Sequence, residues 1–315
     1  MAPDDFRGVL FILAGMFLFS FQDVLIRELS DDGSLLQIIS MRGVLGAVII
    51  LLFMKFTGRK IHFGSSYPWL ALTRVVLFFT GFLCFYFALS GMPLAEATSL
   101  FFASPLFITL LSKYVQKTEI GLYRTAAVIV GFMGVLLIVK PSPDRLNWIY
   151  LLPVLTAFTY AISMLIARHT KEKDSIFQQM IHLYFGSAFL GIGATGLMIG
   201  LGIDETSLPN ADYLLRGWNT TDANVMSIMM VVAALGAVGM LLLTSAYRLG
   251  SPPVIAPFEY SLLILAVSWG YLIFDEIPDG LSILGMALIV GSSLFIFIRE
   301  SIRNKPLAIK TSLRT

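Results

Sequence analysis

Charged side chains are scarce in this chain. Asp, Glu, Lys and Arg make up 13% of its 315 residues, whereas 57% are hydrophobic. A water-soluble protein of this length needs a charged coat, so this composition excludes an ordinary soluble domain and indicates a membrane protein. The net charge of +2 is too small to indicate a nucleic-acid partner. The one cysteine, Cys84, excludes an internal disulfide.

Motifs of catalysis and nucleotide binding are also missing. There is no Gly-x-Ser-x-Gly nucleophile motif, no His/Asp metal cluster, no aspartate pair within an apolar run and no Gly-x4-Gly-Lys-Ser/Thr loop. We therefore expect no enzyme activity, no metal and no cofactor, and any driving force is an ion or solute gradient. Asp4 and Asp5 do not fit a cleavable signal peptide, and the first apolar run is long enough to remain as a span.

Apolar runs of about 20 residues, the length that crosses a bilayer as a helix, fill most of the chain. Lipid leaves backbone groups no other partner, so each run is predicted to be helical. The ten runs are 7–27, 34–54, 69–90, 94–115, 120–140, 147–168, 175–200, 225–247, 253–273 and 279–299. The predicted fold class is an all-α integral membrane protein with ten transmembrane helices.

The chain looks duplicated. The break at Gly91–Pro93 between two apolar runs returns at Gly250–Pro252, and Gln37 corresponds to Gln178. Such a repeat normally places its working site where the copies meet. The predicted units are a first five-helix repeat at 1–141, a second at 142–302 and a basic tail at 303–315.

The distribution of positive charge predicts the orientation. With both termini in the cytoplasm, the outer loops hold only Arg27, Lys140, Arg145 and Arg216 of the 22 Lys and Arg residues, and most of the others fall on the inner side. Five spans per repeat then turn the second copy upside down relative to the first. This is the inverted-repeat architecture of secondary transporters in the cytoplasmic membrane.

Ionisable groups in the first repeat give the first candidates for a binding site. Asp23 and Arg27 lie four residues apart, so we expect them to form a local ion pair. Arg42 lies about 12 Å deep and is costly there without a partner or water. Arg74 either binds a ligand or extends to the cytoplasmic headgroups, and Glu96 either binds a ligand or caps its helix.

Polar groups of the second repeat differ from those of the first. Tyr160, Gln178 and His182 are expected to face a polar cavity. Glu259 is the strongest candidate, because it lies about 10 Å into the bilayer, too deep to be a cap. We expect it to pair with Arg42, Arg74 or His182, or to take up a proton.

Two prolines and one loop complete the predictions from the residues. Pro105 lies in the middle of its span and should kink the helix or leave a carbonyl free toward the cavity. Pro257 precedes Glu259 in the ninth span. The segment 202–224 has no counterpart of its length in the first repeat and is expected to be external and hydrated.

The segments GMPLAEATSLFFASPLF, GFMGVLLIVKP, APFEYSLLILAVSWGYLIFDEIPD and GMALIVGSSLFIFIRE resemble the two repeats of the drug/metabolite transporter superfamily, in its EamA-domain branch. The resemblance covers nearly the whole chain. It implies two inverted five-helix repeats, cytoplasmic termini and a central cavity lined by the first four helices of each repeat. The fifth helices would support packing or a homodimer. Similar members have residues of the same kind at Arg42, Arg74, Glu96, Pro105, Glu259 and Tyr260.

The leading hypothesis is a secondary transporter that moves a small polar or zwitterionic metabolite, amino-acid-like or similar to S-adenosylmethionine, by alternating access. Arg42 and Arg74 would hold a carboxylate or phosphate, and Glu259, with Glu96, an ammonium group or a coupling proton. The aromatic rings of Tyr160, Phe258 and Tyr260 would shield the ligand. The alternatives are a transporter of an organic anion or a vitamin such as riboflavin, in either direction, and a scaffold or sensor that transports nothing. The expected partners are a small solute and the lipid bilayer.

Overall fold

The computed structural model describes residues 3–115, 122–140, 147–170, 172–207, 211–249 and 252–303. The helices of the first half are α1 (Pro3–Glu28), α2 (Leu35–Phe56), α3 (Pro68–Leu89), α4 (Leu94–Phe101), α5 (Ser104–Val115) and α6 (Leu122–Val139). Those of the second half are η1 (Trp148–Tyr150), α7 (Leu151–Thr170), α8 (Ile176–Leu201), α9 (Asp212–Leu215), α10 (Ala223–Leu249), α11 (Pro252–Ile255), η2 (Ala256–Tyr260), α12 (Ser261–Phe274) and α13 (Gly280–Arg303).

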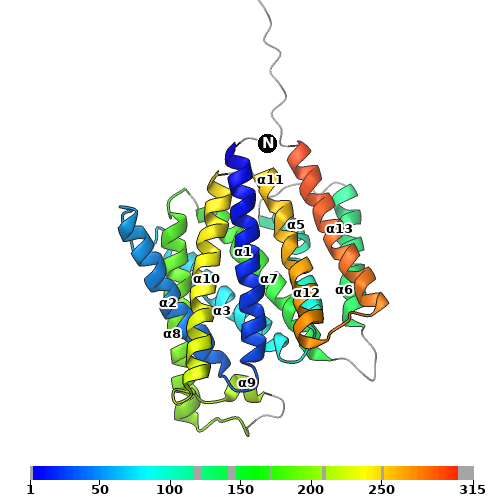
Figure 1. The fold of residues 1–315 in the computed structure, drawn as a ribbon. Coiled ribbons are helices and arrows are strands. Elements are labelled where there is room, and N and C mark those ends of the chain that lie inside the picture. The colour runs from blue at the N-terminus through cyan, green and yellow to red at the C-terminus, as the bar shows by residue number, and fades with distance from the viewer. Residues whose placement is uncertain are drawn as a thin grey trace, which may run out of the picture.

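Within these residues, nine helical segments are long and apolar enough to cross a membrane. The tenth expected span corresponds to α6, whose apolar part, Thr125–Val139, is shorter. The described chain begins and ends at the top of Figure 1, and α9 lies at the bottom. We call these two faces the terminal side and the α9 side.

The two halves pack as an inverted pair. Helix α1 packs along α10, and its counterpart in the second half, α7, packs along α3. Equivalent helices also meet directly, α2 with α8 and α6 with α13. The last contact is close: a Cβ atom on Gly134 would lie 2.6 Å from the Gly285 carbonyl oxygen, and one on Gly285 would lie 2.7 Å from that of Gly134. Small residues here let the backbones touch, as in many membrane helix pairs.

The fourth span of each half is interrupted. Between α4 and α5 the Leu106 N–H bonds to the Ala103 carbonyl, which leaves the Phe102 carbonyl without its helical donor. Ser293 of α13 donates to that carbonyl at 3.2 Å. The predicted disturbance near Pro105 is therefore confirmed. In the second half the span was expected to be one helix, but it contains the 3₁₀ segment η2, which includes Pro257 and Glu259.

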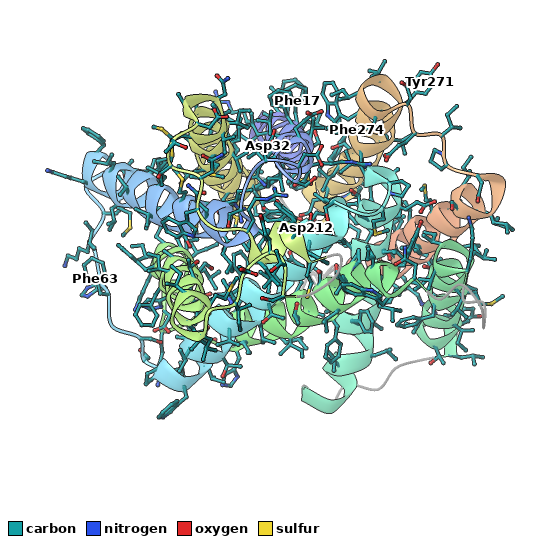
Figure 2. All side chains as sticks on the ribbon, turned by 90° about the horizontal axis from the view of Figure 1, so that it is seen from below. Phe17, Asp32, Phe63, Asp212, Tyr271 and Phe274 are labelled. Atoms are coloured by element: carbon teal, nitrogen blue, oxygen red, sulfur yellow. The ribbon has the colours of Figure 1, made fainter. Side chains whose placement is uncertain are left out.

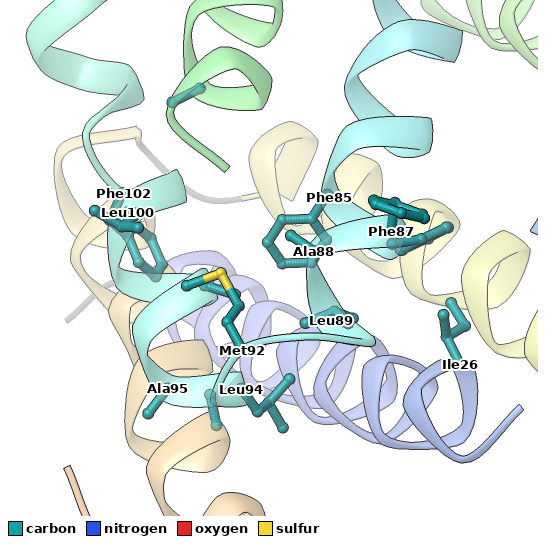
Figure 3. Packing of buried hydrophobic residues seen from close by; sticks show 14 of the residues in the cluster. Ile26, Phe85, Phe87, Ala88, Leu89, Met92, Leu94, Ala95, Leu100 and Phe102 are labelled. Atoms are coloured by element: carbon teal, nitrogen blue, oxygen red, sulfur yellow. The ribbon is translucent and has the colours of Figure 1, made fainter. Parts of the chain in front are cut away.

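An apolar core fills the bundle toward the α9 side. Figure 3 shows Leu89, Met92 and Leu94 around the turn between α3 and α4, and all three side chains are buried. Phe85 and Phe102 belong to the same cluster. This packing fixes the start of α4 beside the second half of the protein.

The expected ion pair between Asp23 and Arg27 is wrong. Arg27 instead pairs with Glu276, in the turn between α12 and α13, and its guanidinium lies 4.3 Å from the centroid of the Phe274 ring. Glu276 also accepts the Leu94 N–H at 3.1 Å. Arg27 therefore pairs with a carboxylate of the other half and not with Asp23 on its own helix.

Residues 211–222, which precede α10, cover the α9 side of the bundle. Figure 2 shows Asp212 of α9 over the middle of the helices in the view from below. Arg216 donates to the carbonyls of Ser30, at 3.1 Å, and Gly33, at 2.9 Å. Tyr213 is only 3% exposed. Part of the segment expected to be hydrated is therefore packed into the protein.

Candidate functional site

Arg42 is buried among aromatic rings. Its side chain is 7% exposed, and its guanidinium carbon lies 4.0 Å from the centroid of the Phe82 ring and 5.8 Å from that of Tyr86. Asp23 is close enough to interact with it electrostatically. Among the described residues, no side chain forms a hydrogen bond or an ion pair with Arg42, so the guanidinium stays available to an anionic group.

Glu259 is surrounded by tyrosines. The Tyr247 hydroxyl donates to Glu259 Oε1, and both Tyr160 and Tyr260 interact electrostatically with the carboxylate. The expected pairing with Arg42, Arg74 or His182 is not found in the described part of the chain. Because its described neighbours are three phenol groups and no cation, the carboxylate can bind a cationic group or a proton.

Aromatic rings in tilted and edge-on contact connect these two groups. The centroid distances are 6.1 Å for Tyr86 and Phe85, 5.9 Å for Phe85 and Phe101, and 5.2 Å for Phe101 and Tyr160. These separations fall within the range of favourable aromatic pairs. One continuous row of rings therefore leads from the Arg42 end to the tyrosines around Glu259.

The interrupted fourth spans lie beside the Glu259 end of this row. Phe102, at the break after α4, stacks on Tyr260 with centroids 4.8 Å apart. Tyr260 also lies close to Ser293, whose hydroxyl donates to the Phe102 carbonyl at 3.2 Å. The non-helical backbone of both halves therefore meets at the candidate site, the arrangement in which transporters form binding sites.

Arg74 lies in a separate pocket nearer the terminal side. It is 8% exposed; Nη1 donates to Gln179 Oε1 at 2.6 Å, and Nε lies 3.2 Å from both oxygens of Ser163. Arg74 therefore does not extend to the headgroups. It interacts electrostatically with Tyr160, which places this pocket next to the Glu259 end. The pocket is lined by Ala71, Arg74, Ile166, Thr170, Asp174, Gln179, His182 and Leu183.

Other predicted residues lie outside the aromatic row. Gln178 forms the capping box of α8 with Ser175 and donates to the Gly64 carbonyl. His182 lines the Arg74 pocket, and its Nε2 lies 2.6 Å from the Phe63 carbonyl oxygen.

Two more predicted residues contact helices at the edge of the site. Glu96 accepts a hydrogen bond from Ser282 of α13 at 2.6 Å and interacts with Tyr150. This contact joins the two halves toward the α9 side. Phe258 packs against a buried cluster that includes Ile12 and Met16 of α1.

Several residues of the site were missed or set aside from the sequence. Tyr247 lies on a different span from Glu259, so no local spacing connects them. Tyr86 and Phe101 belong to a crowd of aromatic residues in which no single one stands out. Asp23 was assigned to Arg27 because helical spacing shows only partners on the same helix. In the described residues, no group of three or more His, Cys, Asp or Glu side chains could hold a metal ion.

Two inverted five-helix units, with non-helical segments meeting at a polar and aromatic site inside the bundle, define a multi-pass membrane transporter. The model of the EamA-like transporter family matches residues 6–140 and again residues 147–298. The chain belongs to this family. One solved crystal structure has a TM-score of 0.62 over 95% of this chain and 99% of its own, at 16% identity, a likeness that shows the fold.

Curated relatives transport different solutes. The S-adenosylmethionine uptake transporter of Rickettsia prowazekii is 24% identical over 93% of both chains. The riboflavin transporter of Rhizobium johnstonii is 31% identical over 76% of this chain and 74% of its own. The pseudopaline exporter CntI of Pseudomonas aeruginosa is 26% identical over 90% of this chain and 93% of its own. The three names include both uptake and export, so membership of the family does not select a solute or a direction.

Proposed function

We propose that this protein is a secondary transporter of a small zwitterionic metabolite, which binds along the aromatic row between Arg42 and Glu259. One observation carries the proposal: among the described residues, the buried cation of Arg42 has no hydrogen-bonded partner and the Glu259 carboxylate accepts a hydrogen bond only from Tyr247, and the two groups lie at the two ends of one row of rings. A solute with an anionic group, a cationic group and a flat ring fits this order of contacts. S-adenosylmethionine, the solute named for several relatives, has all three features.

The transport cycle follows from the paired halves. Rocking of the inverted repeats about the site would expose it first to one side of the membrane and then to the other. We place the protein in the inner membrane with both termini in the cytoplasm, as the loop charges predict. This transport cycle requires no catalytic group, and the proposal includes no enzyme activity.

Arg42 is proposed to bind the anionic group of the solute, and Glu259 its cationic centre or a coupling proton. Substitution Glu259→Gln distinguishes the two roles. Lost affinity for a cationic solute with an unchanged pH dependence assigns Glu259 to the solute. A lost pH dependence with retained affinity assigns it to the proton.

Riboflavin is the second candidate, and the aromatic row itself favours it, because a flavin ring stacks on such residues without needing either charge. The test is uptake of labelled S-adenosylmethionine and of labelled riboflavin by proteoliposomes that contain the purified protein. Saturable uptake of the first, competed by other zwitterions, supports the proposal. Uptake of riboflavin alone would contradict the proposed zwitterionic solute and favour the riboflavin transporter. If no metabolite stabilises the protein in a thermal-shift screen, a scaffold is favoured.

A further inference from the structure

Three buried polar atoms near Tyr86 have no hydrogen-bond partner among the described residues. They are Gln22 Oε1, Arg42 Nε and the Tyr213 hydroxyl. Their side chains are 2%, 7% and 3% exposed. Buried polar atoms are nearly always paired in folded proteins, and each unpaired atom costs stability. Three together, contributed by three separate segments, indicate a place prepared for a ligand.

Their surroundings bring these atoms together. Gln22 Nε2 donates to the Tyr86 hydroxyl at 3.0 Å, which leaves Gln22 Oε1 as a free acceptor. A Cβ atom on Gly236 would lie 2.4 Å from Gln22 Oε1 and 2.8 Å from Arg42 Nε. The Gln22 acceptor and the Arg42 donor therefore lie against the same glycine of α10, Gly236.

Tyr213 approaches this place from the α9 side. It lies on α9, which packs against α2, the helix that carries Arg42, and it belongs to the same buried cluster as Tyr86. Burial raises the pKa of Tyr213, so its hydroxyl remains a neutral donor at physiological pH. Hydrogen bonds from Arg216 to the carbonyls of Ser30 and Gly33 hold the segment that carries it.

The free groups have a definite chemistry. Arg42 Nε–H and the Tyr213 O–H are donors, Gln22 Oε1 is an acceptor, and Asp23 adds a carboxylate that interacts with Arg42. An α-amino-acid group offers the complement, since its carboxylate accepts and its ammonium donates. A phosphate would leave the Gln22 acceptor and the Asp23 carboxylate facing negative oxygen atoms.

We infer that Gln22, Arg42 and Tyr213 form a subsite for the α-amino-acid group of the solute, with its carboxylate on Arg42 and Tyr213 and its ammonium on Gln22 and Asp23. The inference rests on the proposed function and narrows it to solutes with an amino-acid head. It also gives residues 211–222 a role, because they supply Tyr213 and lie on the α9 side of the proposed subsite.

The test measures ligand-induced thermal stabilisation of the purified full-length protein with two matched pairs of probes. S-adenosylhomocysteine is paired with 5′-methylthioadenosine, a thioether that lacks only the amino-acid group, and L-methionine with 3-methylthiopropylamine, which lacks the carboxylate. The variants are Tyr213→Phe, which removes only the hydroxyl, and Gln22→Leu. Tyr271→Phe is the matched control, since Tyr271 is 58% exposed on α12.

We expect at least one amino-acid probe to bind the wild-type protein about tenfold more tightly than its partner. Tyr213→Phe and Gln22→Leu should each weaken that probe about tenfold and leave its partner unchanged. Without ligand, Tyr213→Phe should melt at the same or a higher temperature, because a buried unpaired hydroxyl has been removed. The control Tyr271→Phe should match the wild type in every measurement.

Two results would overturn the subsite, and only one of them would also overturn the proposed solute class. If an amino-acid probe binds and both variants bind it as the wild type does, the subsite is wrong while the proposed zwitterion transport stands. If no amino-acid probe binds more tightly than its partner, the proposed solute class fails together with the subsite. Should Gln22→Leu fail to fold, Tyr213→Phe alone decides.

Discussion

Gln37 and Gln178 hold equivalent positions in the two halves, and each binds the backbone of a loop from the other half. Gln37 follows Ser34 at the start of α2; its Nε2 donates to the Asn219 carbonyl at 3.0 Å, and its Oε1 accepts the Asn219 N–H at 2.9 Å. Gln178 follows Ser175 at the start of α8 and donates to the Gly64 carbonyl. Because α2 begins on the α9 side and α8 on the terminal side, the two contacts close opposite faces of the protein.

Breaking these contacts one at a time should loosen one face at a time. Gln37→Leu removes two hydrogen bonds and should speed hydrogen exchange in the segment 211–222, by an amount that corresponds to about 1–3 kcal/mol. Gln178→Leu should have the same effect on residues 57–67 and leave 211–222 unchanged. Each variant is the control for the other, and equal effects on both loops would contradict a separate closure of each face.

Arg42→Lys should weaken solute binding although it keeps the positive charge. A lysine cannot reproduce the planar guanidinium that lies on Phe82 and offers several donors. We expect KM for a carboxylate-bearing solute to rise about tenfold, or about 1.4 kcal/mol. The comparison is Arg7→Lys, because Arg7 is exposed near the start of α1. Unchanged kinetics in the Arg42 variant would remove Arg42 from the site.

The pH dependence of transport should not depend on Asp279, and it should depend on Glu259 if that carboxylate carries the coupling proton. A hydrogen bond from Lys140 and another from the Ser282 N–H lower the pKa of Asp279 to about 2. A depressed pKa means that this contact contributes stability above the ordinary carboxyl pKa, near 4, and that the contribution is lost only as the pH falls toward 2.

Between about pH 5 and pH 8, Asp279 stays ionised, and Asp279→Asn should leave the shape of the transport pH profile unchanged. Glu259→Gln should flatten the profile if this carboxylate carries the coupling proton. The measurement is initial uptake into proteoliposomes across this range. A profile that changes with Asp279→Asn and not with Glu259→Gln would contradict the assignment.

Gly134→Ala should lower the melting temperature. The new methyl group would lie 2.6 Å from the Gly285 carbonyl oxygen, so α6 and α13 would have to move apart, at a cost of about 1–3 kcal/mol. Gly193→Ala is the matched control, because nothing lies within 4 Å of that position in α8. The control should be neutral or slightly stabilising, since alanine favours a helix over glycine. Equal melting temperatures for the two variants would contradict the close contact of α6 and α13.

Much of the fold could be predicted from the sequence because lipid allows few structures. Span lengths, the repeated landmarks and the break near Pro105 follow from backbone hydrogen bonding and from the thickness of the bilayer. The depths of Arg42 and Glu259 follow from the helical rise in the same way. Arg42 is buried inside the protein, as its cost in lipid requires, and Glu259 accepts a hydrogen bond from Tyr247.

The partners of these residues could not be predicted, because they depend on contacts between spans. Helical spacing predicted an ion pair between Asp23 and Arg27, whereas in the structure Arg27 pairs with Glu276. Glu259 was expected to pair with a cation or to take up a proton; among the described residues it pairs with no cation and accepts a hydrogen bond from Tyr247. No hydrophobic periodicity in residues 211–222 predicted that they pack onto the bundle. The burial of Tyr213 is therefore evident only from the structure.

Counterflow in proteoliposomes tests the central claim most directly. Vesicles loaded with unlabelled S-adenosylmethionine should accumulate the labelled compound transiently when they contain the wild-type protein. Arg42→Ala and Glu259→Gln should each reduce that accumulation at least tenfold, whereas Tyr271→Phe should not change it. Counterflow that survives both site substitutions would contradict the account, because the solute would then be held somewhere other than between Arg42 and Glu259.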